Sequence, residues 1–281
     1  MTILAIQGLR GGSGATSVCA SLAWALAQRE QSVLLVDFST SNLLRLYFNQ
    51  PYEKNSGWAL DIIQQQKLGN PINYISVNHI SVNNISVNNI PAENTAINDI
   101  NTAHGVKKID YLPFGILDEK KLISLDSWLQ EQKNKQPTHL PDELSFLSAV
   151  KYDWIIIDCS STLLSLVELA ESLADINIFT LNPDIGCQVL LKQRILPANS
   201  YFLINRFIPI SLVQQDVSHV WQQCLAGFIP VILHADEAQA ESLALKKPVG
   251  ECRPDSLISN NFIDLADWCL TLNQPNHKDS E

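Results

Sequence analysis

Short apolar runs of strand length alternate along this chain with segments that have helical periodicity, such as 16–28. The runs occupy residues 3–7, 32–37, 154–158, 176–181 and 201–205, and a further strand is expected at 110–115. Strands that are apolar along their whole length are typical of a parallel sheet covered by helices on both faces. Helical crossovers between parallel strands are right-handed and give a doubly wound sheet. The sequence therefore predicts an α/β fold with a mostly parallel sheet and helices on both faces.

The length of the chain and one unusual segment set the expected domain organisation. With 281 residues, we expect a single domain over 1–273 and a flexible tail at 274–281. An Ile-Ser-Val-Asn repeat starts at Ile75, Ile80 and Ile85. The repeat is faintly similar to that of pentapeptide solenoids, but about three copies cannot bury a core. The sequence therefore predicts a low-complexity insertion within the domain at 69–106, and a polar linker at 133–141.

The composition of the chain limits which classes of binding partner and which cellular compartment we expect. The chain has 29 acidic residues against 19 basic ones, a net charge of −10, which argues against general binding to DNA or anionic lipid. Its six cysteines stand singly, so neither a zinc site nor a disulfide framework is predicted. No stretch approaches the roughly 20 apolar residues that a membrane span requires. We expect a soluble, cytoplasmic protein.

The segment that joins the first apolar run to the first helix has the features of a phosphate-binding loop. A glycine-rich turn at the start of a helix leaves backbone N–H groups unpaired, and these donors attract phosphate together with the helix dipole. Thr16 is placed to give its hydroxyl to Mg²⁺. A simple structural turn is the alternative, which the strand–loop–helix context disfavours. The predicted nucleotide-binding residues are Arg10, Gly11, Gly12, Ser13, Gly14, Ala15, Thr16 and Ser17.

Three polar residues end other apolar runs, at the edge of a parallel sheet where ligands bind. They are Asp37, Asp158 and Asn205. Asp158 suits a carboxylate that binds Mg²⁺ through water, and Asp37 suits metal contact or, as a candidate catalytic residue, the activation of water. A helix cap or a solvated strand end is the alternative for either aspartate. The predicted metal site therefore consists of Thr16, Asp37 and Asp158.

Several strings resemble those of a known family. The loop, VLLVD at 33–37, YDWIIID at 152–158 and LINR at 203–206 together resemble the deviant Walker A family of ParA and MinD ATPases. Their order and spacing extend over the chain apart from the repeat. Longer strings are similar to the cellulose biosynthesis protein BcsQ family, namely QGLRGGSGATS at 7–17, NLLRL at 42–46 and HADEAQAESLALKKPVGECRPDSL at 234–257.

This resemblance implies ATP and Mg²⁺ as cofactors and a homodimer that encloses two nucleotides. It places Arg10 where the family has a lysine that reaches the partner's nucleotide. Asn205 corresponds to an asparagine that contacts adenine, with 230–236 expected on the other side of the base; a buried turn cap is the alternative for Asn205. Ala15 replaces the lysine that neutralises phosphate charge, and Ser39 replaces the catalytic aspartate. We therefore predict nucleotide binding with weak or no hydrolysis.

The leading hypothesis, which rests on that resemblance, is an ATP-binding scaffold or slow switch for bacterial cellulose biosynthesis. It would support assembly or polar placement of the membrane cellulose synthase complex through other cytosolic subunits of the secretion system, with recruitment to the inner membrane or cell pole through those partners. Residues 262–272 contain no basic residue and are expected to form a packing helix, so direct membrane insertion is not predicted.

Other classes of function fit the sequence less well. An active ParA-like ATPase that partitions DNA or cargo is the main alternative, and Ala15, Ser39 and the acidic composition weigh against it. Electron transfer of the nitrogenase-reductase type requires cluster ligands, whereas the cysteines stand singly. A protein that binds no nucleotide at all is disfavoured by the intact glycine loop, Thr16 and Asp158.

Overall fold

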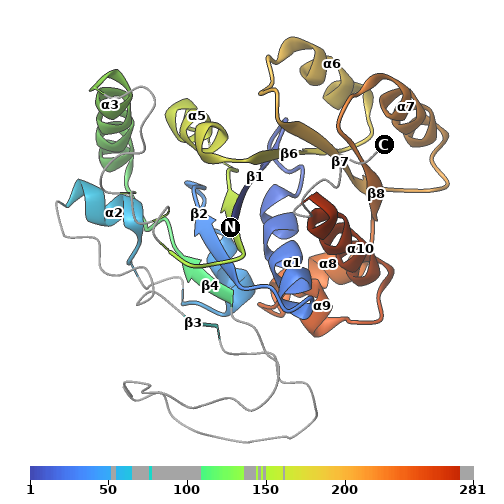
Figure 1. The fold of residues 1–281 in the computed structure, drawn as a ribbon, viewed down its shortest axis with the longest axis horizontal. Helices are drawn as coiled ribbons and strands as arrows, with labels where there is room; N and C mark the ends of the chain where they lie inside the picture. Colours follow the sequence, from blue (N-terminus) through green and yellow to red (C-terminus); the bar gives the residue numbers. More distant parts are fainter. Residues whose placement is uncertain are drawn as a thin grey trace, which may run out of the picture.

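The computed structural model describes residues 1–51, 55–64, 76–77, 109–135, 144, 147, 150–160 and 162–272. Within these residues, eight strands form one sheet in the order β3-β4-β2-β5-β1-β6-β7-β8 (Figure 1). The strands are β1 (Thr2–Gly8), β2 (Val33–Asp37), β3 (Ser76–Val77), β4 (Ile109–Leu112), β5 (Trp154–Asp158), β6 (Ile176–Leu181), β7 (Ser200–Phe207) and β8 (Phe228–His234). Neighbouring strands are parallel except that β3 is antiparallel to β4. The predicted doubly wound, mostly parallel sheet is confirmed.

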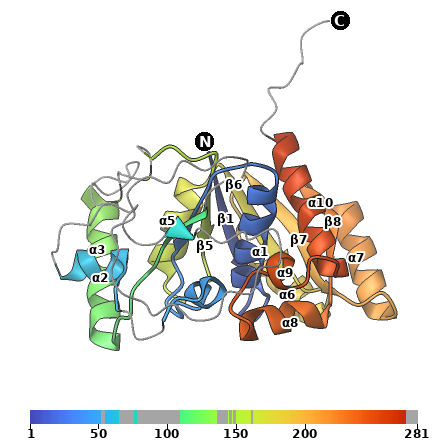
Figure 2. The same ribbon diagram turned by 90° about the horizontal axis from the view of Figure 1, so that it is seen from below.

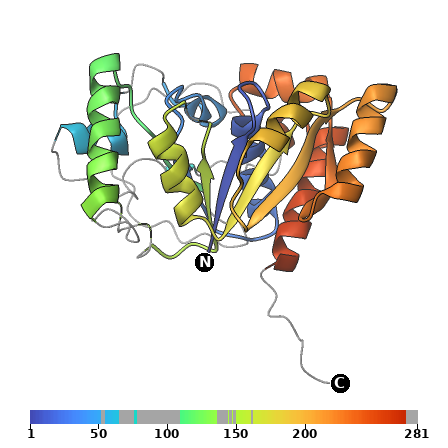
Figure 3. The ribbon, with the colours of Figure 1, turned by 90° about the horizontal axis from the view of Figure 1, so that it is seen from above.

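Helices cover both faces of this sheet. They are α1 (Ala15–Gln28), α2 (Trp58–Ile63), α3 (Glu119–Lys135), α5 (Leu164–Leu173), α6 (Ile185–Gln193), α7 (Leu212–Cys224), α8 (Glu237–Ala244), α9 (Val249–Cys252), α10 (Leu257–Leu272) and the 3-10 helix η1 (Leu44–Phe48). Helices α1 and α10 pack together on one face (Figure 2), and α3, α5, α6 and α7 lie on the other (Figure 3). None of the helices in the described part of the chain combines the length and the apolar character needed to cross a bilayer.

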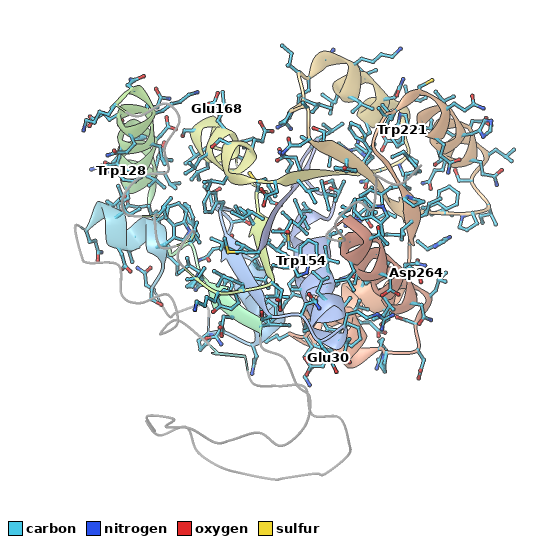
Figure 4. All side chains as sticks on the ribbon, in the orientation of Figure 1. Glu30, Trp128, Trp154, Glu168, Trp221 and Asp264 are labelled. Carbon is cyan, nitrogen blue, oxygen red and sulfur yellow. The ribbon has the colours of Figure 1, made fainter. Side chains whose placement is uncertain are left out.

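Alternate residues of each central strand enter different cores, which is why the strands are apolar throughout. In β1, Leu4 and Ile6 pack in the core that contains α1 and α10, whereas Ala5 belongs to the core under α2, α3 and α5. Trp154 is buried in the first of these cores, and Trp221 of α7 is buried in a third core beneath α6 and α7 (Figure 4). The apolar runs therefore form the central layer between two layers of helices.

Most expected strands agree with the structure to within a few residues, although the strand expected at 110–115 ends at Leu112 and the one expected at 201–205 continues to Phe207. The predicted linker at 133–141 is wrong at its start, because α3 continues through Lys135; residues 136–141 lie outside the described residues. Strand β8 was not predicted, because its exposed Pro230 interrupts the apolar pattern; proline is tolerated since β8 lies at the edge of the sheet. The expected insertion at 69–106 is described only at β3.

Close packing between α1 and α9 generates a first prediction. A Cβ on Gly250 would lie 2.0 Å from Cζ3 of Trp24, a ring that is only 9% exposed. The Gly250→Ala substitution is therefore expected to lower the free energy of unfolding by about 1–3 kcal/mol, because the helix must shift to admit the methyl group. Thermal denaturation measures the loss, with Gly11→Ala as the matched control, since a Cβ there meets no atom within 4 Å. Equal melting temperatures for the two variants would contradict this packing.

Candidate functional site

The loop between β1 and α1 leaves the first backbone amides of α1 available. Gly12 and Gly14 have φ angles of 76° and 90°, in the left-handed region that glycine adopts without strain. Gly14 is the N-cap of α1, and no side chain of the described residues caps this helix. The first amides of α1 therefore remain as donors for a ligand, and the helix dipole adds partial positive charge at the same place.

Ser13 fixes this loop to the sheet from behind. Its side chain is buried, and its Oγ lies 2.9 Å from Oγ1 of Thr180 at the end of β6. Its carbonyl accepts a hydrogen bond of 2.7 Å from Nδ2 of Asn205 in β7. A Cβ on Gly8 would lie 1.8 Å from Ser13 Oγ, so only glycine fits beside it. Asn205 thus holds the loop between β1 and α1 through a hydrogen bond, in addition to lying at the predicted end of a strand.

The outer side of the loop is open at Gly11 and Gly12, and Arg10 precedes these glycines. A Cβ on Gly11 or Gly12 would meet no atom within 4 Å. The guanidinium of Arg10 is exposed and forms an ion pair with Asp184, the residue that caps α6 by accepting a hydrogen bond of 2.8 Å from the amide of Cys187. Arg10 is therefore held by a residue of its own chain, whereas the sequence predicts that it contacts a nucleotide.

Thr16 and Asp158 come together at the carboxyl end of β5. Oγ1 of Thr16 lies 3.3 Å from Oγ of Ser160, and this second hydroxyl donates to Oδ1 of Asp158 at 2.7 Å. Asp158 is fully buried, and its Oδ2 has no hydrogen-bond partner among the described residues. Burial raises the pKa of Asp158, whereas the hydroxyls of Thr16 and Ser160 oppose that rise. An unpartnered carboxylate oxygen beside a hydroxyl is a donor set that suits Mg²⁺.

Asp37 lies next to Asp158 in the register of β2 and β5, but its surroundings differ. Its Oδ1 accepts a hydrogen bond of 2.8 Å from the amide of Ser39, and its Oδ2 accepts one of 3.1 Å from the hydroxyl of Tyr111. Burial, and next the charge of Asp158, raise the pKa of Asp37 well above its ordinary range, although the two hydrogen bonds and the charge of Arg45 oppose the rise. Both oxygens of Asp37 are thus engaged, unlike Oδ2 of Asp158.

Two of the three positions that depart from the family pattern, Ala15 and Ser39, are buried. Ala15 is the first residue of α1 and is 4% exposed. Oγ of Ser39 donates to the carbonyl of Ser160 at 3.0 Å and lies 2.7 Å from Oγ of Ser41. Ser39 therefore ties the loop after β2 to the loop after β5. Neither side chain supplies a charge or a base at neutral pH.

A cavity of about 820 Å³ opens beside the head of α1. Of the predicted nucleotide-binding residues, Gly14, Ser17 and Asn205 line it. The expected base-binding segment 230–236 contributes only its last three residues, His234, Ala235 and Asp236. Further lining residues come from η1, the residue after β7 and the helices that follow, and no motif marks them in the sequence: Tyr47, Ile208, Gln214, Ile258 and Phe262. Arg206 also lines the cavity, and it is the last residue of the LINR string at 203–206.

The buried carboxyl group of Asp37 predicts a pH-dependent cost in stability. Its pKa lies above the ordinary value of 3.8, so the folded state favours the protonated form, and stability falls as the pH rises from about 4 through the folded-state pKa. An asparagine stays neutral and can keep the contacts with Ser39 and Tyr111. We expect Asp37→Asn to raise the free energy of unfolding at pH 8, because the variant no longer ionises a buried carboxyl group.

Urea titration of the nucleotide-free protein at pH 8 and pH 4 measures this effect. The gain should shrink at pH 4, where the unfolded carboxyl group is itself largely protonated. A destabilised variant at pH 8 would mean instead that the ionised carboxylate is a net stabilising group.

Two comparisons of sequence agree on a family. The profile described as cellulose biosynthesis protein BcsQ matches residues 1–73 and 95–270. Cellulose biosynthesis protein BcsQ of Escherichia coli (strain K12) is 34% identical over 277 residues, which cover 96% of this chain and 94% of that protein. The Salmonella typhimurium protein of the same name is 32% identical over 271 residues, with the same coverage of 96% and 94%. The residues between the two matched segments lie inside the expected insertion.

Solved structures share the fold at lower identity. The septum site-determining protein MinD of Pyrococcus horikoshii OT3, complexed with Mg-ADP, has a TM-score of 0.64 and 21% identity, with 96% of each chain covered. A ParA family ATPase from Chlorobium tepidum TLS has a TM-score of 0.61 and 18% identity, with 94% of this chain and 98% of that chain covered. The chain therefore has a ParA/MinD-like P-loop fold. By its sequence, it belongs to the cellulose biosynthesis protein BcsQ family.

Proposed function

We propose that this protein binds ATP with Mg²⁺ and acts in cellulose biosynthesis as a nucleotide-bound scaffold or slow switch. The observation that carries the proposal is the uncapped head of α1, where glycines face open space beside the 820 Å³ cavity. Backbone donors at a helix start attract phosphate without help from a lysine. The cavity falls within the size range of small-molecule sites, and the similar MinD was solved with Mg-ADP.

The surroundings of Thr16 fit Mg²⁺. Oδ2 of Asp158 is buried without a partner near the hydroxyl of Thr16, and Mg²⁺ prefers oxygen ligands, including waters and phosphates. Asp37 remains a candidate at this site, although its two oxygens already accept hydrogen bonds. When bound, Mg²⁺ neutralises phosphate charge. Thr16 and Asp158 would hold it, directly or through water.

Weak or absent hydrolysis follows from two side chains. The transferring phosphoryl group gains negative charge that an aimed cation stabilises, and Ala15 cannot provide it. Ser39 is a poor base, and its hydroxyl is already hydrogen-bonded to the loop after β5. Backbone donors that bind the ground state are retained, whereas groups that act in the transition state are missing. We therefore propose that the protein keeps its bound nucleotide intact for long periods.

The cellular role is proposed from the family. The similar bacterial proteins are named for cellulose biosynthesis, and we assign this chain a role in the assembly or polar placement of the synthase complex. A homodimer that encloses two nucleotides would present a surface to other cytosolic subunits of the secretion system. These subunits would recruit it to the inner membrane or cell pole, because an excess of acidic residues disfavours direct contact with anionic lipid or DNA.

Nucleotide binding is tested by equilibrium dialysis with ATP and Mg²⁺. The wild-type chain is expected to bind, and Gly11→Ala to weaken binding about tenfold or more, because a methyl group on the open side blocks the close approach of phosphate. The melting temperature of this variant should match that of the wild type, which separates a binding defect from a folding defect. The proposal is refuted if neither ATP nor ADP binds at millimolar concentration.

Turnover is tested by steady-state phosphate release, with a ParA family ATPase assayed in parallel. We expect release at least about a hundredfold slower than from that enzyme, since loss of one transition-state donor typically costs 10²–10³-fold in rate. Addition of DNA should not change the rate. Vigorous release that DNA stimulates would instead identify an active ParA-like partition ATPase.

A further inference from the structure

The end of β7 contains an irregularity beside the cavity. Ile204 pairs with Ile232 and Phe207 pairs with His234, so three steps along β7 match two steps along β8. Asn205 and Arg206 occupy this bulge. Bulges are uncommon in parallel sheets, and they redirect a side chain away from the alternation of the strand. The direction of the Arg206 side chain therefore differs from the one that a regular β7 would give.

The backbone of Arg206 is in a conformation that its own β-carbon disfavours. Its φ is 58°, in the left-handed region where residues other than glycine are uncommon. Oδ1 of Asn205 accepts a hydrogen bond of 3.0 Å from the amide of Arg206, which stabilises the turn. The same Asn205 side chain holds the carbonyl of Ser13 through its Nδ2. One asparagine thus fixes both the phosphate loop and the position of Arg206.

Arg206 lies beside the head of α1. Its Nε is 3.9 Å from the position that a Cβ on Gly14 would occupy, and both residues line the cavity. The side chain is exposed, and no carboxylate of the described residues lies within ion-pair distance of it. Asp236, an acid that lines the same cavity, is occupied by the amides of Ala238 and Ile258. The positive charge of Arg206 is therefore available to a ligand.

We propose that Arg206 contacts the phosphate group that the amides at Gly14 hold, and adds positive charge that favours binding of the ground state. This inference rests on the proposed binding of ATP. A guanidinium matches phosphate through parallel N–H donors, and its position next to Gly14 favours the phosphates over the base. Arg10, the arginine of the loop itself, is bound to Asp184 in the same chain.

Isothermal titration of the full chain with ATP and with adenosine, each with Mg²⁺, tests the contact. Arg206→Gln and Arg206→Gly should each weaken ATP binding about tenfold, the effect of one charged hydrogen bond, and change adenosine binding less than twofold. Arg206→Lys should recover part of the ATP affinity. The glycine variant relieves the left-handed backbone, so its melting temperature should equal or exceed that of the wild type. Lys151→Gln, which alters an exposed charge before β5, is the control and should bind like the wild type.

The outcomes separate this inference from the function on which it rests. Equal losses for ATP and adenosine would place Arg206 against the base and overturn the phosphate contact. Full ATP affinity in both the glutamine and the glycine variants would overturn any contact. If the wild-type chain binds ATP while the Arg206 variants behave in either of these ways, the proposed function stands without this residue. If the wild-type chain binds no ATP, both fail.

Discussion

The candidate site depends on the hydrogen bonds that attach Ser13 of the glycine-rich loop to the sheet. A glycine-rich loop can take many backbone conformations, so its amides do not point to one place unless other groups fix them. Here the side chain of Ser13 meets Thr180, and its carbonyl is held by Asn205. These partners lie near the carboxyl ends of β6, which pairs with β1, and of β7, which is the next strand beyond it. The sheet therefore determines the loop, and donors preorganised in this way bind an anion without the cost of ordering them.

Binding and hydrolysis of a nucleotide make different demands on a sequence, and the proposed function rests on that difference. Binding of phosphate uses backbone amides, which every residue except proline supplies once the loop is shaped, so an alanine such as Ala15 leaves the donors in place. Hydrolysis needs particular side chains at particular atoms. Ser39 has become part of the structure instead, since its hydroxyl links the loops after β2 and β5. An aspartate at that buried position would add a third carboxyl group close to Asp37 and Asp158.

The sequence predicted the sheet well because fully apolar strands have few alternatives, and β6 was placed without error at 176–181. It predicted the location of the acids and of Asn205 because strand ends converge on one edge. It could not predict hydrogen-bond partners that are distant in the chain. Nothing in the local sequence of Asp37 indicates that Tyr111 donates to it, 74 residues away. The bulge at Arg206 was also hidden, because register depends on the neighbouring strand.

The different environments of Arg10 and Arg206 bear on how the proposed dimer would respond to nucleotide. To reach a nucleotide in a partner subunit, Arg10 must first leave Asp184, so the phosphate contact contributes only its difference in free energy from an existing ion pair. That pair is partly exposed and therefore weak, which keeps the exchange accessible. Arg206 loses no ion pair to a described residue when it meets a ligand. The two arginines would thus act in two stages. Arg206 would favour binding of the nucleotide within its own subunit, and Arg10 would contact the nucleotide of the second subunit.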